Sequence, residues 1–202
     1  TGTNAAYVER LENVRKLHAH DGCRTRRPGD LMVMNTEWGA WIDDDNTIVP
    51  ITPYDTQLDL ASANPTRQIL EKLTSGMYLG ELARLAALEL YRAQRFDMVV
   101  QDGSPLYVDE GVDSSFLSVM AEDGDESLTE SRRHIAEVLG AQGVSVHDAL
   151  ALRLISTAVV RRAARLAGVA TAAIALQSGR LDAIDPACKG TESVYREQEL
   201  TE

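Results

Sequence analysis

Residues 64–94 read NPTRQILEKLTSGMYLGELARLAALELYRAQ and carry a clear helix signal. Asn64 can cap a helix N-terminus, and Pro65 suits the first helical position, where its missing N–H would have no intrahelical partner. Behind them isoleucine and leucine residues recur at helical spacing. The stretch therefore predicts one long helix from Asn64 to about Gln94, with Gly76 and Gly80 inside it.

The residues before this helix read as strands. An apolar-rich segment at 3–11 and a second at 31–41 are separated by a polar loop, and acidic turn residues follow the second segment. This pattern predicts strands over most of the first 55 residues.

The residues after the long helix predict mainly further helices. The segment 96–108 mixes β-branched and aromatic residues around a turn and receives no single assignment. An amphipathic helix is predicted at 127–139, and Ser145 with Asp148 three residues later resembles a capping box that opens a helix through Leu176. Strands therefore come early and helices late. The last residues, 185–202, lose apolar periodicity and are expected to form a surface excursion or a disordered end.

Length and charge restrict the class of protein. The 202 residues suffice for one sizeable domain. Acidic residues outnumber basic ones 31 to 20, and the net charge of −11 opposes binding to nucleic acid or anionic membranes. Two distant cysteines indicate neither a disulfide framework nor a zinc site, which favours the cytoplasm. Thr1 in place of an initiator methionine suggests an interior start.

The most apolar stretch, 149–176, is expected to be a core helix rather than a membrane span. Arg153 and three further arginines interrupt it, and each would be costly within a hydrocarbon layer. We expect Arg161, Arg162 and Arg165 to line a helix face and pair with acidic neighbours. His134 and His147 are expected on helix surfaces.

Several short motifs occur together in a definite order. TGTNAAY stands at 1–7, NTEWGA at 35–40, and Asn64-Pro65 leads to Gln68 and Glu71. With SGMYLGE at 75–81, SSFLS at 114–118 and RAARL at 162–166, these motifs resemble hexokinases, over roughly Thr1 to Ala175. The run VPITPYD at 49–55 resembles fungal members of the family.

The resemblance implies an α/β fold, the large-domain part of the actin-like ATPase (ribonuclease H-like) hexokinase fold, with residues 1–202 forming one partial domain. It implies transfer of the γ-phosphoryl group of ATP to the 6-hydroxyl of glucose or a related hexose. Mg²⁺ would be bound mainly through the nucleotide phosphates. The implied partners are the hexose, ATP and the small domain of the same parent chain, with no nucleic acid or membrane.

A sugar-binding role for five residues follows from the resemblance. A pyranose presents hydroxyl groups that donate and accept, so its site needs amides and carboxylates at fixed angles. Buried polar groups left unpaired by a wrong sugar provide discrimination. Gln68 and Glu71, three apart, share a helix face. The implied sugar-binding residues are Asn4, Asn35, Glu37, Gln68 and Glu71.

A nucleotide-binding role is implied for three small segments. Phosphates require close backbone approach and oriented N–H or hydroxyl donors, which small residues in tight turns provide. The sequence has no Walker-type phosphate loop. No protein residue is expected to hold a metal. The implied nucleotide-binding residues are Thr1, Gly2, Gly76, Met77, Ser114, Ser115, Phe116, Leu117 and Ser118.

The family's catalytic aspartate lies shortly upstream of the residue that matches Thr1, so none is expected in this chain. The segment alone should therefore lack kinase activity. Two departures from the family, Ser114 for the usual threonine and the Trp41-Ile42 pair, motivate a rival reading as a hexokinase-like regulatory or sugar-sensing protein. A sugar kinase with a different substrate is a third reading.

Overall fold

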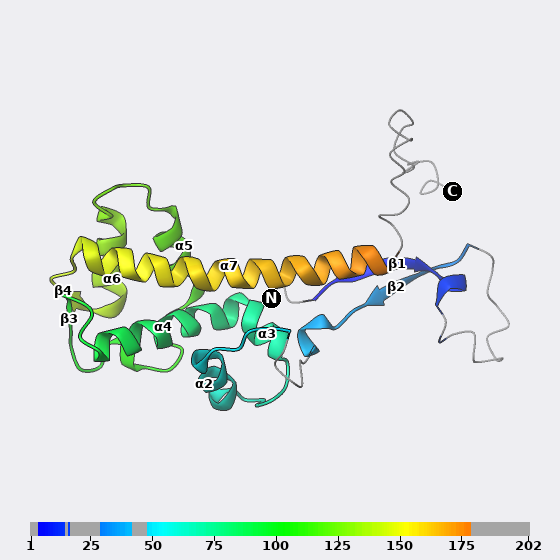
Figure 1. The fold of residues 1–202 in the computed structure, drawn as a ribbon, viewed down its shortest axis with the longest axis horizontal. Helices are drawn as coiled ribbons and strands as arrows, with labels where there is room; N and C mark the ends of the chain where they lie inside the picture. The colour runs from blue at the N-terminus through cyan, green and yellow to red at the C-terminus, as the bar shows by residue number, and fades with distance from the viewer. Residues whose placement is uncertain (1–3, 15, 17–28, 42–47, 179–202) are drawn as a thin grey trace.

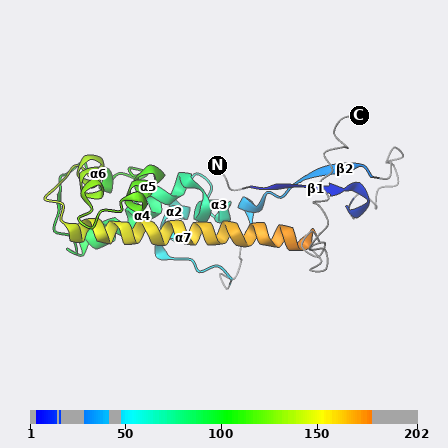
Figure 2. The ribbon, with the colours of Figure 1, turned by 90° about the horizontal axis from the view of Figure 1, so that it is seen from above.

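A computed structural model of the protein describes residues 4–14, 16, 29–41 and 48–178. The helices between residues 53 and 177 gather in an elongated body, and a two-stranded ribbon from the first part of the chain extends beyond that body (Figures 1 and 2). None of the described helices is both long enough and apolar enough to cross a membrane.

The ribbon consists of strands β1 (Ala6–Arg10) and β2 (Leu31–Asn35), which pair antiparallel. Their register sets Ala6 opposite Asn35, so the residues just before β1 lie beside those just after β2. A one-turn helix, η1 (Leu11–Asn13), follows β1. The predicted strands are confirmed in their central parts, but β2 ends early because Glu37 adopts a left-handed conformation and starts a second one-turn helix, η2 (Trp38–Ala40).

A helix that the sequence did not predict, α2 (Pro53–Ala61), follows. It corrects the assignment of residues up to 55 to strands. The Thr52 hydroxyl accepts a hydrogen bond from the Asp55 N–H at 3.3 Å, and the Asp55 carboxylate accepts one from the Thr52 N–H at 2.7 Å. This reciprocal capping box, with Pro53 at the first helical position, fixes where the helix begins.

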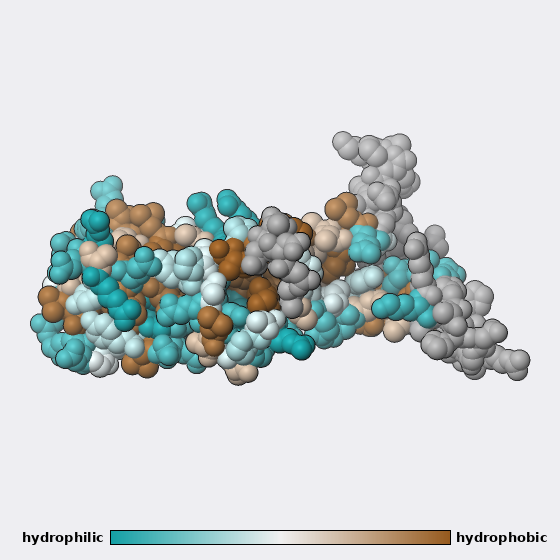
Figure 3. All heavy atoms as spheres, turned by 60° about the horizontal axis from the view of Figure 1, so that its bottom comes forward, coloured by the Kyte–Doolittle hydropathy of each residue, from teal (hydrophilic) through white to brown (hydrophobic). Residues whose placement is uncertain are grey.

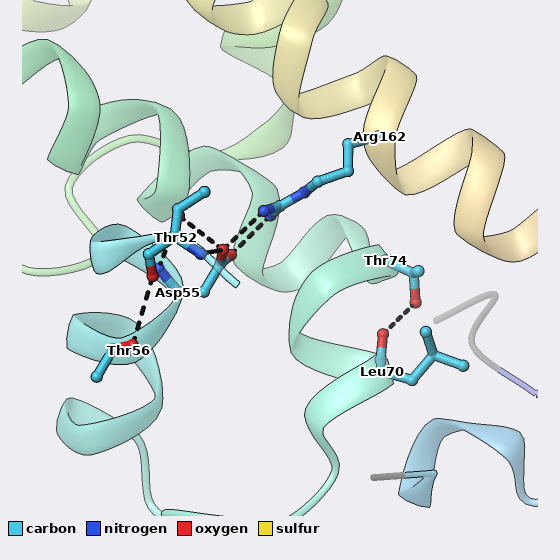
Figure 4. A network of polar contacts seen from close by, with 6 residues as sticks. All are labelled: Thr52, Asp55, Thr56, Leu70, Thr74 and Arg162. Atoms are coloured by element: carbon cyan, nitrogen blue, oxygen red, sulfur yellow. Dashed lines mark hydrogen bonds and ion pairs between the residues drawn. The ribbon is translucent and has the colours of Figure 1, made fainter. Parts of the chain in front are cut away.

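The single helix predicted from Asn64 to Gln94 is wrong. Residues 62–68 form turns, and two helices follow, α3 (Ile69–Thr74) and α4 (Gly76–Arg92). The helix is interrupted at Ser75. The backbone of Ser75 is extended, and its hydroxyl accepts a hydrogen bond from the Met77 N–H. The Thr74 hydroxyl donates back to the Leu70 carbonyl at 2.6 Å (Figure 4), and such local hydrogen bonds compete with a continuous helix.

The remaining elements are β3 (Val99–Val100), η3 (Pro105–Tyr107), α5 (Ser114–Glu122), α6 (Thr129–Leu139), β4 (Ala141–Gln142) and α7 (Val146–Gln177). Helices α6 and α7 confirm two sequence predictions, including both hydrogen bonds of the Ser145–Asp148 capping box. Helix α5 was not predicted. The expected C-terminal excursion at 185–202 lies outside the described residues.

The hydrophobic core lies where α4, α5 and α7 pack against one another, with α3 also against α7. Its most deeply buried large side chains come from η3, α5 and α6, and they are Leu106, Leu117, Met120, Ile135 and Leu139. The prediction of a core helix holds for the first part of α7, where Leu152 is buried, but Val169 and Leu176 farther along are exposed. On the face that Figure 3 shows, hydrophobic and hydrophilic side chains are interspersed over the helical body.

A buried ion pair ties α2 to α7. Arg162 donates two hydrogen bonds to the two oxygens of Asp55, both at 2.7 Å, and Asp55 is only 6% exposed (Figure 4). Burial by itself raises the pKa of Asp55, but the hydrogen bonds from Arg162 and Thr52 outweigh it and lower the pKa below its usual value. Arg162 therefore confirms the expected pairing with an acidic residue, whereas Arg161 and Arg165 are exposed.

Replacing Arg162 with methionine should lower the free energy of unfolding by about 3 kcal/mol at neutral pH, because it leaves the Asp55 carboxylate buried without its partner. The folded-state pKa of Asp55 is depressed, so the contribution of the pair is present above the unfolded pKa of about 4 and is lost as pH falls below it. Urea unfolding at pH 7 and pH 3 measures both effects. Arg161→Met, on the exposed side of the same helix, is the control. Equal unfolding midpoints for the two variants would contradict the role of the pair.

Candidate functional site

Three of the predicted sugar-binding residues form one hydrogen-bonded row at the end of the β1–β2 ribbon. The Asn4 amide donates to the Asn35 side-chain oxygen at 2.5 Å, and the Asn35 amide donates to the Glu37 carboxylate. Thr36 adds hydrogen bonds from its hydroxyl to Asn4, at 3.1 Å, and to the Ala5 carbonyl, at 2.7 Å. The strand register explains the row, because it sets the residues before β1 beside those after β2.

The other two predicted sugar-binding residues lie at the start of α3, the helix that packs against η2. Helix η2, which starts directly after Glu37, packs against α3. Gln68 precedes α3 in a left-handed conformation, and Glu71 lies in its first turn; both side chains are half-buried. The structure thus joins Asn4, Asn35 and Glu37 in one row, and η2, which follows that row, packs against the helix of Glu71. Asn4, Asn35 and Glu37 are exposed to solvent.

Two of the predicted nucleotide-binding segments also meet. A Cβ atom added to Gly76, the first residue of α4, would lie 3.5 Å from the hydroxyl oxygen of Ser114, the first residue of α5. The N-termini of two helices thus lie side by side, and helix N-termini favour anions through their free N–H groups and dipole. Met77 and Ser115 are exposed beside this junction.

Some of the predicted nucleotide-binding residues have side chains that are not exposed to solvent. Phe116 and Leu117 are 3% and 1% exposed and belong to the hydrophobic core, so only their backbone could face a ligand. Ser118 is exposed on α5. Thr1 and Gly2 lie outside the described residues.

Asp113, which caps α5, was not among the predicted residues. Its carboxylate accepts hydrogen bonds from the Ser115 N–H at 2.8 Å and from the Ser115 hydroxyl at 2.5 Å. These hydrogen bonds lower the pKa of Asp113 and keep it ionised. An aspartate directly before a serine pair, with a hydrophobic run behind it, is an N-cap signal that could have predicted α5.

Tyr78 lies in the first turn of α4 and is half-buried. Burial raises the pKa of the Tyr78 hydroxyl, and the negative charges of Glu71 and Glu110 raise it further. The charge of Glu71 in α3 thus acts on Tyr78, two residues after Gly76. The Ser75 break sits between them.

Among the described residues, one group of three side chains has the spacing of metal ligands: Asp97, His147 and Asp148. Asp148 is fully buried, and its two oxygens already accept the N–H groups of Asp97, Met98 and Ser145 at 2.7–3.1 Å. The Asp97 carboxylate accepts the Ser145 hydroxyl at 2.9 Å. The hydrogen bonds of Asp97 and Asp148 therefore hold the N-terminus of α7.

The two histidines on the late helices differ. His147 is exposed, as predicted. His134 corrects the prediction of a helix-surface residue, because its ring stacks on Phe116 with centroids 5.6 Å apart and its Nε2 atom is buried. The aromatic partner comes from α5, a helix that the sequence pattern did not show.

Comparison with known proteins places the chain in a family. A family model for hexokinases matches residues 1–199. Glucokinase of Aspergillus niger is 34% identical over 194 residues, which cover 92% of this chain and 39% of the glucokinase. Hexokinase-3 of Mus musculus is 38% identical over 182 residues, 86% of this chain and 18% of that protein.

A solved structure gives the same result. The hexokinase of Schistosoma mansoni complexed with glucose is similar with a TM-score of 0.71 and 29% identity, over 85% of this chain and 37% of that one. This confirms the predicted α/β class, the actin-like ATPase fold of hexokinases with strands early and helices late. The chain spans 39% of the length of the Aspergillus glucokinase, and it belongs to the hexokinase family.

Proposed function

We propose that the chain is the sugar- and nucleotide-binding segment of a larger hexokinase that transfers the γ-phosphoryl group of ATP to the 6-hydroxyl of glucose or a related hexose. The observation that carries the proposal is the Asn4–Asn35–Glu37 row, which leads directly into η2, the one-turn helix that packs against the helix of Glu71. Residues far apart in sequence thereby present amides and carboxylates in one region.

The chemistry of the row suits a neutral, hydroxyl-rich ligand. Each amide both donates and accepts, and a carboxylate accepts strongly from a hydroxyl group. Without a ligand, the three side chains satisfy one another. A hexose whose hydroxyls replace these contacts would keep every group paired, and an analogue lacking a hydroxyl would leave one unpaired.

The junction of α4 and α5 suits the phosphates of the nucleotide. The absent side chain of Gly76 leaves room at the start of α4, and the half-buried Ser114 places a hydroxyl beside it. ATP would enter with Mg²⁺ bound mainly through its phosphates, and the Ser114 and Ser118 hydroxyls are candidate donors. The Ser115 hydroxyl would have to leave Asp113 to donate to a phosphate. Ser114 supplies the same hydroxyl as the threonine usual in the family.

The base that deprotonates the sugar hydroxyl would lie in the parent protein outside these 202 residues, together with the small domain that completes the cleft. Residues 1–202 would form one partial large domain of a cytoplasmic parent, with 185–202 as an excursion. The rival function, a hexokinase-like sugar sensor, is favoured by one feature: Trp41, which is 40% exposed, stands just after η2 beside the proposed sugar region.

A coupled ATP-to-ADP assay with glucose distinguishes the two functions. We expect turnover by the full-length parent and none by residues 1–202 alone, because phosphoryl transfer needs a positioned base and a complete cleft. Calorimetric titration of the 202-residue chain should show weak or absent glucose binding. A parent without turnover at high enzyme concentration would leave the sensor as the function.

Replacing Glu37 with glutamine in the parent should raise KM for glucose about 10- to 100-fold and change KM for ATP by less than threefold. The reason is the loss of a charge-assisted hydrogen bond, worth roughly 1.5–3 kcal/mol, at the sugar alone. Steady-state kinetics with each substrate varied in turn measure both constants. Glu126→Gln, an exposed carboxylate in the linker before α6, is the matched control. Equal effects of the two changes would refute the sugar role of Glu37.

A further inference from the structure

A buried ion pair on α4, formed by Glu81 and Arg84, lies outside the proposed sugar- and nucleotide-binding residues. Arg84 is 2% exposed and Glu81 is 9% exposed. The Arg84 Nε atom donates to Glu81 at 2.6 Å, and a second guanidinium nitrogen also contacts the same carboxylate. Burying two charges costs desolvation energy that their attraction seldom repays by itself. The other contacts of the pair therefore indicate what it does.

Those contacts all reach one loop, the segment 106–110 that runs from η3 toward α5. Arg84 donates to the Leu106 carbonyl at 2.8 Å and to the Asp109 carboxylate at 3.0 Å. The Glu81 carboxylate accepts the backbone N–H of Glu110 at 2.8 Å. The pair thus holds the loop at three points, two of them on the backbone. The hydrogen bond to Glu81 outweighs the effect of burial and raises the pKa of Arg84.

The clamped loop leads directly into the proposed nucleotide site. Glu110 adopts a left-handed conformation, with φ of 57°, which a non-glycine residue holds only when its surroundings impose it. Two residues later the loop presses on α4, where a Cβ on Gly80 would lie 2.2 Å from the Val112 carbonyl oxygen. Ser114 follows at once, with its hydroxyl beside Gly76.

We propose that Glu81 and Arg84 are positioning residues for the nucleotide, which fix Ser114 and Ser115 against the start of α4 through the loop 106–113. The inference rests on the proposed function and adds to it a pair that touches no substrate. Arginine is required because one planar guanidinium reaches Glu81, Leu106 and Asp109 together, which a lysine ammonium on a flexible stem cannot reproduce. Small displacements of a positioned group lower affinity and rate strongly.

The test uses the full-length parent with the double variant Glu81→Met/Arg84→Met, which removes both charges and preserves side-chain bulk, so no unpaired buried charge remains. We expect KM for ATP to rise about tenfold or more, KM for glucose to change less than threefold, and Tm to stay within a few degrees. Arg84→Lys keeps the positive charge but loses the planar guanidinium group. It should raise KM for ATP in the same way. A fluorescent ATP analogue should show a parallel rise in Kd.

The matched control is Glu130→Met/Arg133→Met on α6, an exposed pair with the same spacing, which should leave both KM values unchanged. An unchanged KM and Kd for nucleotide in the α4 double variant and in Arg84→Lys, with an active wild-type parent, would overturn the inference and leave the proposed function standing. A double variant that merely melts earlier, with both KM values unchanged, would assign the pair a structural role only. A wild-type parent that binds no nucleotide would instead refute the proposed function, and the inference with it.

Discussion

The arrangement of the candidate site depends on one close approach, between α4 and the loop that enters α5. A Cβ on Gly80 would lie 2.2 Å from the Val112 carbonyl oxygen and 2.7 Å from the Asp113 Cα atom, distances that real Cβ atoms do not adopt. Only glycine permits this packing. Because Gly80 stands one helical turn after Gly76, the same face of α4 that admits the loop also receives Ser114. The two helix N-termini would otherwise separate.

Around this contact, buried charges fix elements that hydrophobic packing alone would allow to slide. Arg84 with Glu81 holds the loop before α5, Arg162 with Asp55 joins α7 to α2, and the buried Lys72 donates to Asp59 at 2.6 Å between α3 and α2. Each bond is directional, so each fixes one relative placement of its elements. The break at Ser75 separates Glu71 in α3, a proposed sugar residue, from Gly76 and Met77 in α4, two proposed nucleotide residues.

The sequence correctly predicted features that depend on interactions between residues close together in the chain. The capping box of Ser145 and Asp148 marked the start of α7 correctly, because both hydrogen bonds form within four residues. The prediction of a continuous helix from Asn64 failed at Ser75. There a hydrogen bond to the Ser75 hydroxyl, and the packing of α3 and α4 against their neighbours, prevail over the leucine periodicity. The α2 capping box at Thr52 and Asp55 is equally local, and the same kind of signal predicts the start of α2.

The candidate site followed from resemblance more than from pattern. Nothing in the spacing of Asn4 and Asn35 indicates that a strand register brings them into contact. The resemblance implies ligand contacts for the whole motif at 114–118, yet Phe116 and Leu117 are core residues, because the unpredicted helix α5 turns them inward. Long-range partners such as His134 on Phe116 are likewise set by tertiary packing.

The most direct measurement is a crystal structure of the full-length parent with glucose and a non-hydrolysable ATP analogue. The account predicts sugar hydroxyls within hydrogen-bond distance of Asn35, Glu37 and Glu71, and analogue phosphates at the junction of Gly76 and Ser114. A hexose bound elsewhere, or Glu37 and Glu71 directed to opposite sides of the molecule, would contradict it.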